Sequence, residues 1–197
     1  MVKIDFKKEY NELYNPSSKK ISFVDVPKLK YLAIDGKGDP NTSKEYKDSI
    51  EALMATSFTT KFIMKKEYSQ DYVVMPLEGL WYSGDNEDKS NWKWKSMIMQ
   101  PHFIKKENIA QAKEEVARKK DLPSLDKIEF MEMEEGLSAQ ILYIGLFSEE
   151  GPTVEKIHNE IQKEKYELNG VHHEIYLSDA RRAKPEKLRT IIRQPVK

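Results

Sequence analysis

The sequence repeats one order of predicted elements, and this repeat constrains the fold more than any other feature. In the first half, LKYLAID predicts a strand and the next segment, 42–64, predicts a helix. YVVMPLEGLW and NWKWKSMIMQ then predict two further strands, joined by the polar turn GDNEDKS. The order is strand, helix, strand, strand.

The second half begins the same order again. SAQILYIGLF predicts a strand, TVEKIHNEIQKEKYEL at 153–168 predicts a helix, and HHEIYLSD and KLRTIIRQPV predict two strands. The loops before the two helices, GKGDPNTS and FSEEGPT, also resemble each other in composition and position. Internal repetition of this kind usually means two units that share one core.

The spacing of apolar residues supports both helices. Each helix has a Thr or Ser at its start that can cap it, Thr42 or Ser43 in the first and Thr153 in the second. Apolar residues then recur at three- and four-residue intervals, which predicts one buried face per helix. They are Ile50, Leu53, Met54, Phe58 and Phe62 in the first helix, and Val154, Ile157, Ile161 and Leu168 in the second.

We therefore expect an α+β fold of two pseudo-symmetric βαββ repeats, with antiparallel sheets forming a central ligand cleft at the pseudo-twofold axis. Repeat one covers about 28–100 and repeat two about 125–197, with a charged connector helix at 105–120 between them. Residues 1–20 form a lead-in that packs on the 21–197 domain through aromatic side chains.

Composition narrows the class of partner. Lys plus Arg and Asp plus Glu both number 33, so the formal net charge is zero and no global field favours nucleic acid or an anionic membrane. The chain has no Cys, which suits a reducing compartment. It has no apolar run of about 18 residues, and MVKIDFKKEY lacks the apolar core of a signal peptide. We expect a cytoplasmic protein, monomeric or homodimeric, with a small-molecule partner.

Strand alternation identifies two candidate carboxylates, because every second side chain of a strand shares a face. A strand over YVVMPLE places Tyr72 and Glu78 on one face, and HHEIY places His172, Glu174 and Tyr176 on one face. If these faces meet at the axis, the two carboxylates converge in an aromatic surround. In LEGLW the Glu also stands beside a Trp, which suggests a buried charge within a stacking surface.

A carboxylate in an apolar, aromatic cavity gains affinity for a cation or a transferable proton. Aromatic walls stack on flat ligands and favour positive charge over the ring face. The alternative is that each Glu is a solvated residue on a half-exposed strand and that the aromatic side chains are ordinary core. The residues alone leave both interpretations open.

Metal and cofactor signals are weak. His172 and His173 are adjacent in a predicted strand, so they point to opposite faces and cannot both bind one metal. The sequence has no Cys and no HExxH spacing, and IDGKGDP lacks the spacing of a phosphate-binding loop. We therefore expect no metal and no cofactor.

The stretches YVVMPLEGLWY and GVHHEIYLSDARRAKPEKLRTIIRQPV, with IDGKGDPN before them, resemble the GyrI-like small-molecule-binding family. The resemblance runs from about residue 19 to the C-terminus and implies the SOUL/GyrI-like fold. In the related effector domains of multidrug-sensing transcription activators, an acidic residue amid aromatics receives flat cationic drugs, and the matching position is Glu78. No helix-turn-helix pattern precedes LKYLAID, so we do not expect a transcription-factor role.

A stand-alone branch of the family, which this sequence resembles through LEGLW and HHEIYLSD, hydrolyses the strained cyclopropane of DNA-alkylating cyclopropanoids. The resemblance implies Glu174 as the base, with Glu78 as second carboxylate, although the motifs do not settle which Glu has which task. It also implies aromatic walls that hold the planar compound. The matching residues are Tyr72, Trp81, Trp92, Trp94, Phe147 and Tyr176.

Three functions stay open at this point. The first is a cofactor-independent hydrolase that detoxifies cyclopropanoids, and the second is a module that binds or sequesters planar, often cationic compounds without converting them. The third, inhibition of DNA gyrase, comes from the family name, and the absence of a strongly charged segment argues against it. Turnover separates the first two, since only an enzyme converts an excess of substrate.

Overall fold

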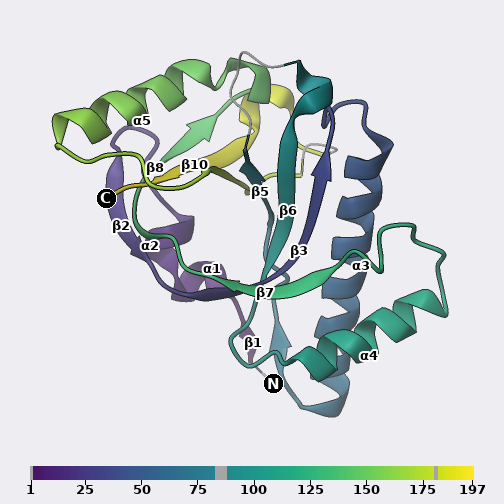
Figure 1. The fold of residues 1–197 in the computed structure, drawn as a ribbon. Helices are drawn as coiled ribbons and strands as arrows, with labels where there is room; N and C mark the ends of the chain where they lie inside the picture. The colour runs from purple at the N-terminus through teal and green to yellow at the C-terminus, as the bar shows by residue number, and fades with distance from the viewer. Residues whose placement is uncertain (1, 83–87, 180–181) are drawn as a thin grey trace. The chain divides into compact units, whose positions relative to one another are not determined.

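A computed structural model describes residues 2–82, 88–179 and 182–197. The chain forms two compact units: unit 1 contains Met1–Glu9 and Leu29–Met133, and unit 2 contains Tyr10–Lys28 and Glu134–Lys197. Each unit combines helices with a four-stranded antiparallel arrangement (Figure 1), which confirms the predicted α+β class. No helix within the described residues is both long enough and apolar enough to cross a membrane.

Unit 1 is built on four strands in the order β5-β6-β3-β7, and the registers of these neighbours are antiparallel. A short parallel pair, β1 with β4, lies apart from this sheet. The elements are β1 (Lys3–Ile4), α1 (Phe6–Glu9), β3 (Leu29–Lys37), α3 (Lys44–Glu67), β4 (Asp71–Tyr72), β5 (Leu77–Trp81), η1 (Lys89–Asn91), β6 (Lys93–Gln100), α4 (Lys106–Ala117) and β7 (Glu129–Met133).

Unit 2 is also built on four strands, in the order β2-β8-β10-β9, with antiparallel neighbours throughout. Its helix α5 lies on one face of this sheet. The elements are α2 (Asn11–Tyr14), β2 (Ser22–Val26), β8 (Gly136–Ile144), η2 (Phe147–Glu149), α5 (Gly151–Lys163), β9 (His172–Tyr176), η3 (Pro185–Lys187) and β10 (Arg189–Pro195).

The two units share one topology. In each unit the chain runs strand, helix, strand, strand: β3-α3-β5-β6 in unit 1 and β8-α5-β9-β10 in unit 2. The last strand of each repeat is central and pairs with the other two. A further strand then pairs with the first strand of the repeat, β7 with β3 and β2 with β8. The predicted βαββ repeat is confirmed, whereas β2 and β7 were missed.

Helix α3 begins where the sequence predicts, because the Ser43 side chain accepts a hydrogen bond from the backbone N–H of Tyr46. Its buried face differs from the prediction, since Phe58 and Phe62 are 47% and 60% exposed. Small side chains instead form much of the buried stripe, and they let the helix approach a sheet that already carries bulky residues. The buried small and polar residues are Ser49, Ala52, Thr56, Ser57 and Thr60.

The predicted strand over YVVMPLEGLW is interrupted. Asp71 and Tyr72 form β4, which pairs with β1, and the next strand, β5, starts only at Leu77. Pro76 has no backbone N–H to give to a sheet, which accounts for a break just before β5. The alternation argument that placed Tyr72 and Glu78 on one face was therefore wrong. The predicted turn GDNEDKS lies mostly outside the described residues.

Helix α5 ends at Lys163, earlier than predicted, and starts at Gly151 rather than at Thr153. Lys165 takes a left-handed φ of 64°, and the N–H of Tyr166 donates to the Ile161 carbonyl at 3.0 Å, which closes the helix end. Leu168, predicted on the buried face of the helix, is 51% exposed and forms an isolated bridge with Val196.

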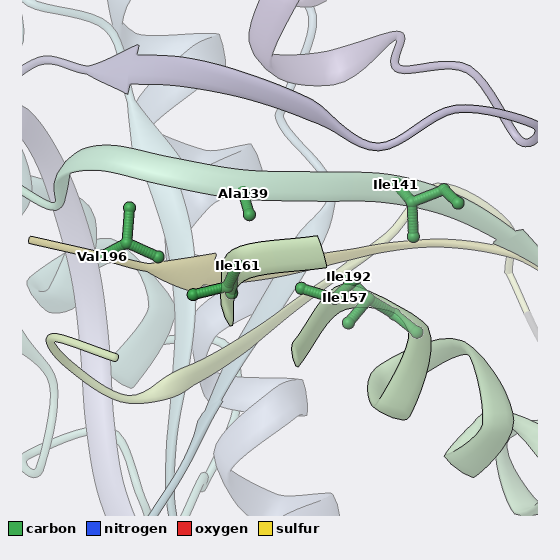
Figure 2. Close-up of a cluster of buried hydrophobic side chains, with 6 residues drawn as sticks. All are labelled: Ala139, Ile141, Ile157, Ile161, Ile192 and Val196. Carbon is green, nitrogen blue, oxygen red and sulfur yellow. The ribbon is translucent and has the colours of Figure 1, made fainter. Parts of the chain in front are cut away.

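The core of unit 2 defines which side of its sheet faces α5. Figure 2 shows Ile157 and Ile161 of the helix among four side chains from β8, β10 and the residue that follows β10. These four side chains are Ala139, Ile141, Ile192 and Val196. Because Ile192 is one of them, any residue directly opposite it in β9 also lies on the α5 face.

The lead-in, residues 1–20, contains two short helices with buried side chains. Leu13 and Tyr14 of α2 are 5% and 4% exposed, and both belong to unit 2. Phe6 of α1, which the sequence analysis did not single out, is 1% exposed and belongs to unit 1. The segment before residue 20 therefore contributes buried side chains to each unit.

Candidate functional site

Strand β9 presents Glu174 on the face that α5 covers. Glu174 lies directly opposite Ile192 of β10, and Tyr176 lies opposite Thr190. Alternation along β9 then places His172, Glu174 and Tyr176 on the same face, as the sequence predicts. The residues between them, His173 and Ile175, are 0% exposed and lie on the other face.

A carboxylate, an imidazole and a second carboxylate meet beside β9. Glu174 is 7% exposed, and its Oε1 lies 3.2 Å from Nε2 of His172. Glu150, which immediately precedes α5, brings its carboxylate to the same place, and one donor atom from each residue lies within 4.8 Å of the other two. This cluster can hold a proton or a cation and can orient a water molecule.

Two aromatic side chains belong to the same region of unit 2. The rings of Phe147 and Tyr176 meet edge to face, with centroids 5.5 Å apart and planes at 82°. Phe147 is 38% exposed and Tyr176 is half-buried, so both keep ring surface that a flat ligand can contact. The structure thus brings three predicted site residues, Glu174, Tyr176 and Phe147, into one unit.

In unit 1 the candidate carboxylate, Glu78, is fully buried in β5, opposite Met97 of β6. The α3 side of this sheet is the other face, because Gln100 of β6 donates to the Ser57 hydroxyl of α3 at 3.2 Å. Met97 is three residues from Gln100, so it points away from α3. Glu78 shares this orientation and is therefore on the face opposite to α3.

The three tryptophans gather on the α3 side of unit 1. Trp81 lies directly opposite Trp94 in the β5–β6 register, and its ring meets that of Trp92 edge to face with centroids 5.8 Å apart. Tyr46 of α3 packs edge to face on Trp94 at 4.9 Å and lies 6.1 Å from Trp81. The predicted grouping of Trp81, Trp92 and Trp94 is present in the structure.

The tryptophans differ in exposure. Trp94 is 1% exposed, and its indole N–H donates to the Gly38 carbonyl at 3.2 Å. Trp81 and Trp92 are half-buried, and the ammonium of Lys89 lies 5.2 Å from the centroid of the Trp92 ring. Trp94 is therefore the buried member on which the cluster packs, whereas Trp81 and Trp92 keep exposed ring surface that a ligand can contact.

The expectation that Glu78 lies within the tryptophan surface is wrong. Residues three apart in a strand point to opposite faces, and Glu78 and Trp81 have this spacing in the continuous β5–β6 ladder. Adjacency in the sequence suggested contact that the strand geometry does not allow. Glu78 instead shares its face with Leu80, which is 6% exposed.

Tyr72 belongs to a different aromatic group. It is 1% exposed, and its ring packs edge to face on Phe103 with centroids 5.8 Å apart. Burial raises the pKa of the Tyr72 hydroxyl well above its usual range. Its strand, β4, pairs with β1 and lies outside the sheet that carries the tryptophans.

Behind Glu174, on the opposite face of the unit 2 sheet, lies a buried polar network. Gln140, Arg193 and His173 are directly opposite one another on β8, β10 and β9. Arg193 donates to Oε1 of Gln140 at 3.1 Å, to Oε2 of Glu135 at 3.1 Å and to the Leu13 carbonyl at 2.8 Å. Nδ1 of His173 lies 2.9 Å from Oε1 of Glu135.

This network fixes the charge on Glu135. Burial alone would raise the pKa of this carboxyl, but the attraction of His173 and Arg193 outweighs burial and lowers it to about 2. The side chains of Arg193, Glu135 and His173 are 1%, 4% and 0% exposed. Because it joins β8, β9, β10 and α2, the network holds the strand that carries Glu174.

Sequence reasoning missed both Glu135 and Glu150. Glu150 lies in SEEGP, which reads as a loop, and its approach to Glu174 depends on how α5 packs on the sheet. For Glu135 a signal existed, because TIIRQP places an Arg inside an apolar strand, and a buried Arg requires an anionic partner. Only the structure identifies which of the many Glu residues is that partner.

An α+β fold with a buried carboxylate, an imidazole and exposed aromatic rings is typical of a domain that binds small molecules. The family comparison agrees. The model of the GyrI-like small molecule binding domain matches residues 19–197, and the chain belongs to this family. A search of curated proteins gave no match.

Solved structures give close relatives. An uncharacterized conserved protein from Listeria innocua has 38% sequence identity and a TM-score of 0.91, and the match covers 99% of this chain and 100% of that one. A hydrolase from Listeria innocua has 38% identity and a TM-score of 0.89, with the same coverage. The EcmrR C-terminal domain, at 10% identity and a TM-score of 0.56, covers 90% of this chain and 97% of its own and shares the fold.

Proposed function

We propose that the protein hydrolyses the strained cyclopropane ring of planar cyclopropanoid compounds, with Glu174 as the base that activates water. The observation that carries this proposal is the position of Glu174, which is 7% exposed, lies 3.2 Å from His172 and shares its face with the half-buried ring of Tyr176. The likeness to a Listeria innocua hydrolase at 38% identity supports an enzymatic role.

The chemistry needs one base and correct orientation. A water oxygen attacks a ring CH2 group, the strained C–C bond breaks, and its electron pair passes into a conjugated carbonyl of the substrate, which becomes an enolate or phenolate. Glu174 takes the proton of the attacking water and returns it to that oxygen. Relief of ring strain drives the step, so positioning of water and substrate supplies the remaining acceleration.

The aromatic residues have the binding role in this proposal. Phe147 and Tyr176 offer ring surface near Glu174, and Trp81 and Trp92 offer ring surface in unit 1. Glu78 is the second carboxylate of this proposal, and it is fully buried on the face opposite to Trp81.

A second function, binding without turnover, is favoured by one observation. The matched family is described by small-molecule binding, and the aromatic surfaces and buried carboxylates would serve a binding protein equally well. Both functions predict binding of planar ligands. They differ in whether the ligand is consumed.

Mass spectrometry of a cyclopropanoid incubated with about a hundredth of its molar amount of protein tests the proposal. We expect complete conversion to a product heavier by one water. Removing a general base costs about 10²–10⁴-fold in rate, so Glu174→Gln should lose at least about a hundredfold in turnover while it still binds the ligand. Glu149→Gln, which changes an exposed carboxylate nearby, is the matched control.

Two results would count against the enzyme. Unchanged compound that still quenches tryptophan fluorescence would establish a binding protein for this class. Equal turnover by Glu174→Gln and the parent would remove Glu174 from the mechanism, and Glu78→Gln would then be the variant to compare.

A further inference from the structure

The cluster beside β9 adds Glu150 to His172 and Glu174, which strand alternation already placed on one face. His172 and Glu174 come from alternate positions of one strand, and Glu150 comes from the residue before α5. One donor atom of each residue lies within 4.8 Å of the other two. The sequence excluded a site built from His172 and His173, but the structure adds two carboxylates to His172 alone.

The distances suit a transition-metal ion. Zinc binds imidazole nitrogen and carboxylate oxygen at about 2.0–2.2 Å, so two ligand atoms on one tetrahedral ion lie about 3.4 Å apart. Nε2 of His172 and Oε1 of Glu174 are already 3.2 Å apart, and the widest pair in the cluster is within 4.8 Å. Small side-chain rotations would bring all three atoms onto one ion.

The surroundings distinguish this cluster from acidic groups on an open surface. Glu174 is buried, and Glu150 and His172 are half-buried, so their charges are less screened than on a surface. Two carboxylates that approach each other in such a place repel, and a bound cation relieves the repulsion. An imidazole with two carboxylates favours zinc and similar ions over magnesium or calcium, which prefer all-oxygen sites.

We propose that Glu150, His172 and Glu174 form a binding site for one divalent transition-metal ion, with Zn²⁺ as the representative ligand. Three protein ligands leave the remaining coordination position to water or another small ligand. Binding of the ion itself does not depend on the function proposed above. Its consequence does: an ion on Glu174 occupies the carboxylate needed as a base, so Zn²⁺ would inhibit hydrolysis.

Calorimetric titration of ZnCl₂ into the full chain, freed of metal by chelator and dialysis and carrying no histidine tag, tests the site. We expect one Zn²⁺ per chain. Glu150→Gln and His172→Asn should each weaken the affinity at least about tenfold, because each removes one of three ligands. Glu149→Gln and His158→Asn, which remove a carboxylate and an imidazole outside the cluster, should bind as the parent does.

The absorption spectrum of bound Co²⁺ gives a second measurement of metal binding, independent of calorimetry. Coordination by the cluster should give a visible d–d band in the parent that weakens in both cluster variants. Thermal unfolding of the metal-free variants shows whether they are folded, and the parent's spectrum and stoichiometry remain decisive if one variant is not.

The site is overturned if the parent binds less than one ion per chain, or if folded Glu150→Gln and His172→Asn both bind as tightly as the parent. Because no substrate is present, absence of hydrolysis leaves the metal result intact. Conversely, hydrolysis without metal binding would remove this site and leave the role of Glu174 unchanged.

Discussion

The two units share a βαββ skeleton but stabilise it differently around their candidate carboxylates. In unit 1 the sheet is supported by aromatic packing, with Trp94 enclosed between β3 and Tyr46 of α3. In unit 2 the equivalent strands are joined by a buried ionic network centred on Glu135 and Arg193. One topology therefore accommodates either aromatic packing or a paired ionic network beside its strands.

The carboxylates also lie on different faces of their sheets. Glu174 points to the face covered by α5, whereas Glu78 points away from α3. The repeat therefore does not make Glu78 and Glu174 equivalent, although each lies in the second strand of its βαββ repeat. Glu174 has an imidazole and half-buried rings beside it, which is why the catalytic role is proposed for it rather than for Glu78.

The largest effect is expected from breaking the aromatic support of unit 1. Trp94→Ala should reduce the free energy of unfolding by about 3–5 kcal/mol, because it removes a 1% exposed side chain from a packed site. Trp92→Ala should cost less than about 1.5 kcal/mol, since part of the ring already faces solvent, and should mainly weaken ligand binding. Urea-induced unfolding of both variants measures the difference. Equal losses would show that Trp92 has a core role as well.

The ionic support of unit 2 can be broken at Glu135. Glu135→Gln should reduce the free energy of unfolding by about 3 kcal/mol, because it leaves Arg193 with a buried charge that has lost its anion. Glu134→Gln, next to it and exposed, is the control and should change stability little. A small effect at both positions would mean that the network contributes little to the stability of unit 2.

The stability lost in Glu135→Gln should also depend on pH. The pKa of Glu135 is lowered from 4.5 to about 2 in the folded protein, so its stabilising contribution is complete above about 4.5 and is lost as the pH falls toward 2. The stability difference between the parent and Glu135→Gln should therefore shrink across that range. Urea unfolding at a series of pH values measures it, and a difference that is constant with pH would contradict the assignment.

The sequence predicted the skeleton because its signals are local. Ser43 caps α3 as expected, and alternation in HHEIY correctly grouped His172, Glu174 and Tyr176. The errors came where tertiary packing decides. Phe58 and Phe62 follow a helical spacing, yet small residues occupy the face against the sheet.

The candidate site was predicted only in part for the same reason. Glu150 and Glu135 reach their partners through folding of segments distant in sequence, which no local pattern encodes. Glu78 and Trp81 are close in sequence but lie on opposite faces of β5. Their proximity in the sequence suggested a side-chain contact that the strand register prevents. Spacing within a strand is thus informative about faces, whereas proximity in the sequence is not.

The smallest expected effect concerns Gly36, whose place in β3 is set by Trp94. The two residues are directly opposite in the β3–β6 register, and a Cβ added at Gly36 would lie 2.1 Å from the indole ring. Gly36→Ala must therefore displace Trp94 and should cost about 1–3 kcal/mol in urea unfolding. Gly151→Ala, where an added Cβ meets no atom within 4 Å, should leave stability unchanged or raise it by up to about 1 kcal/mol because Ala favours the helix.

Since Trp94 adjoins Trp81, the displacement should also alter tryptophan fluorescence in Gly36→Ala. An unchanged emission spectrum and unchanged stability would show that the indole does not rest on β3, and the aromatic support assigned to unit 1 would then lose its anchor.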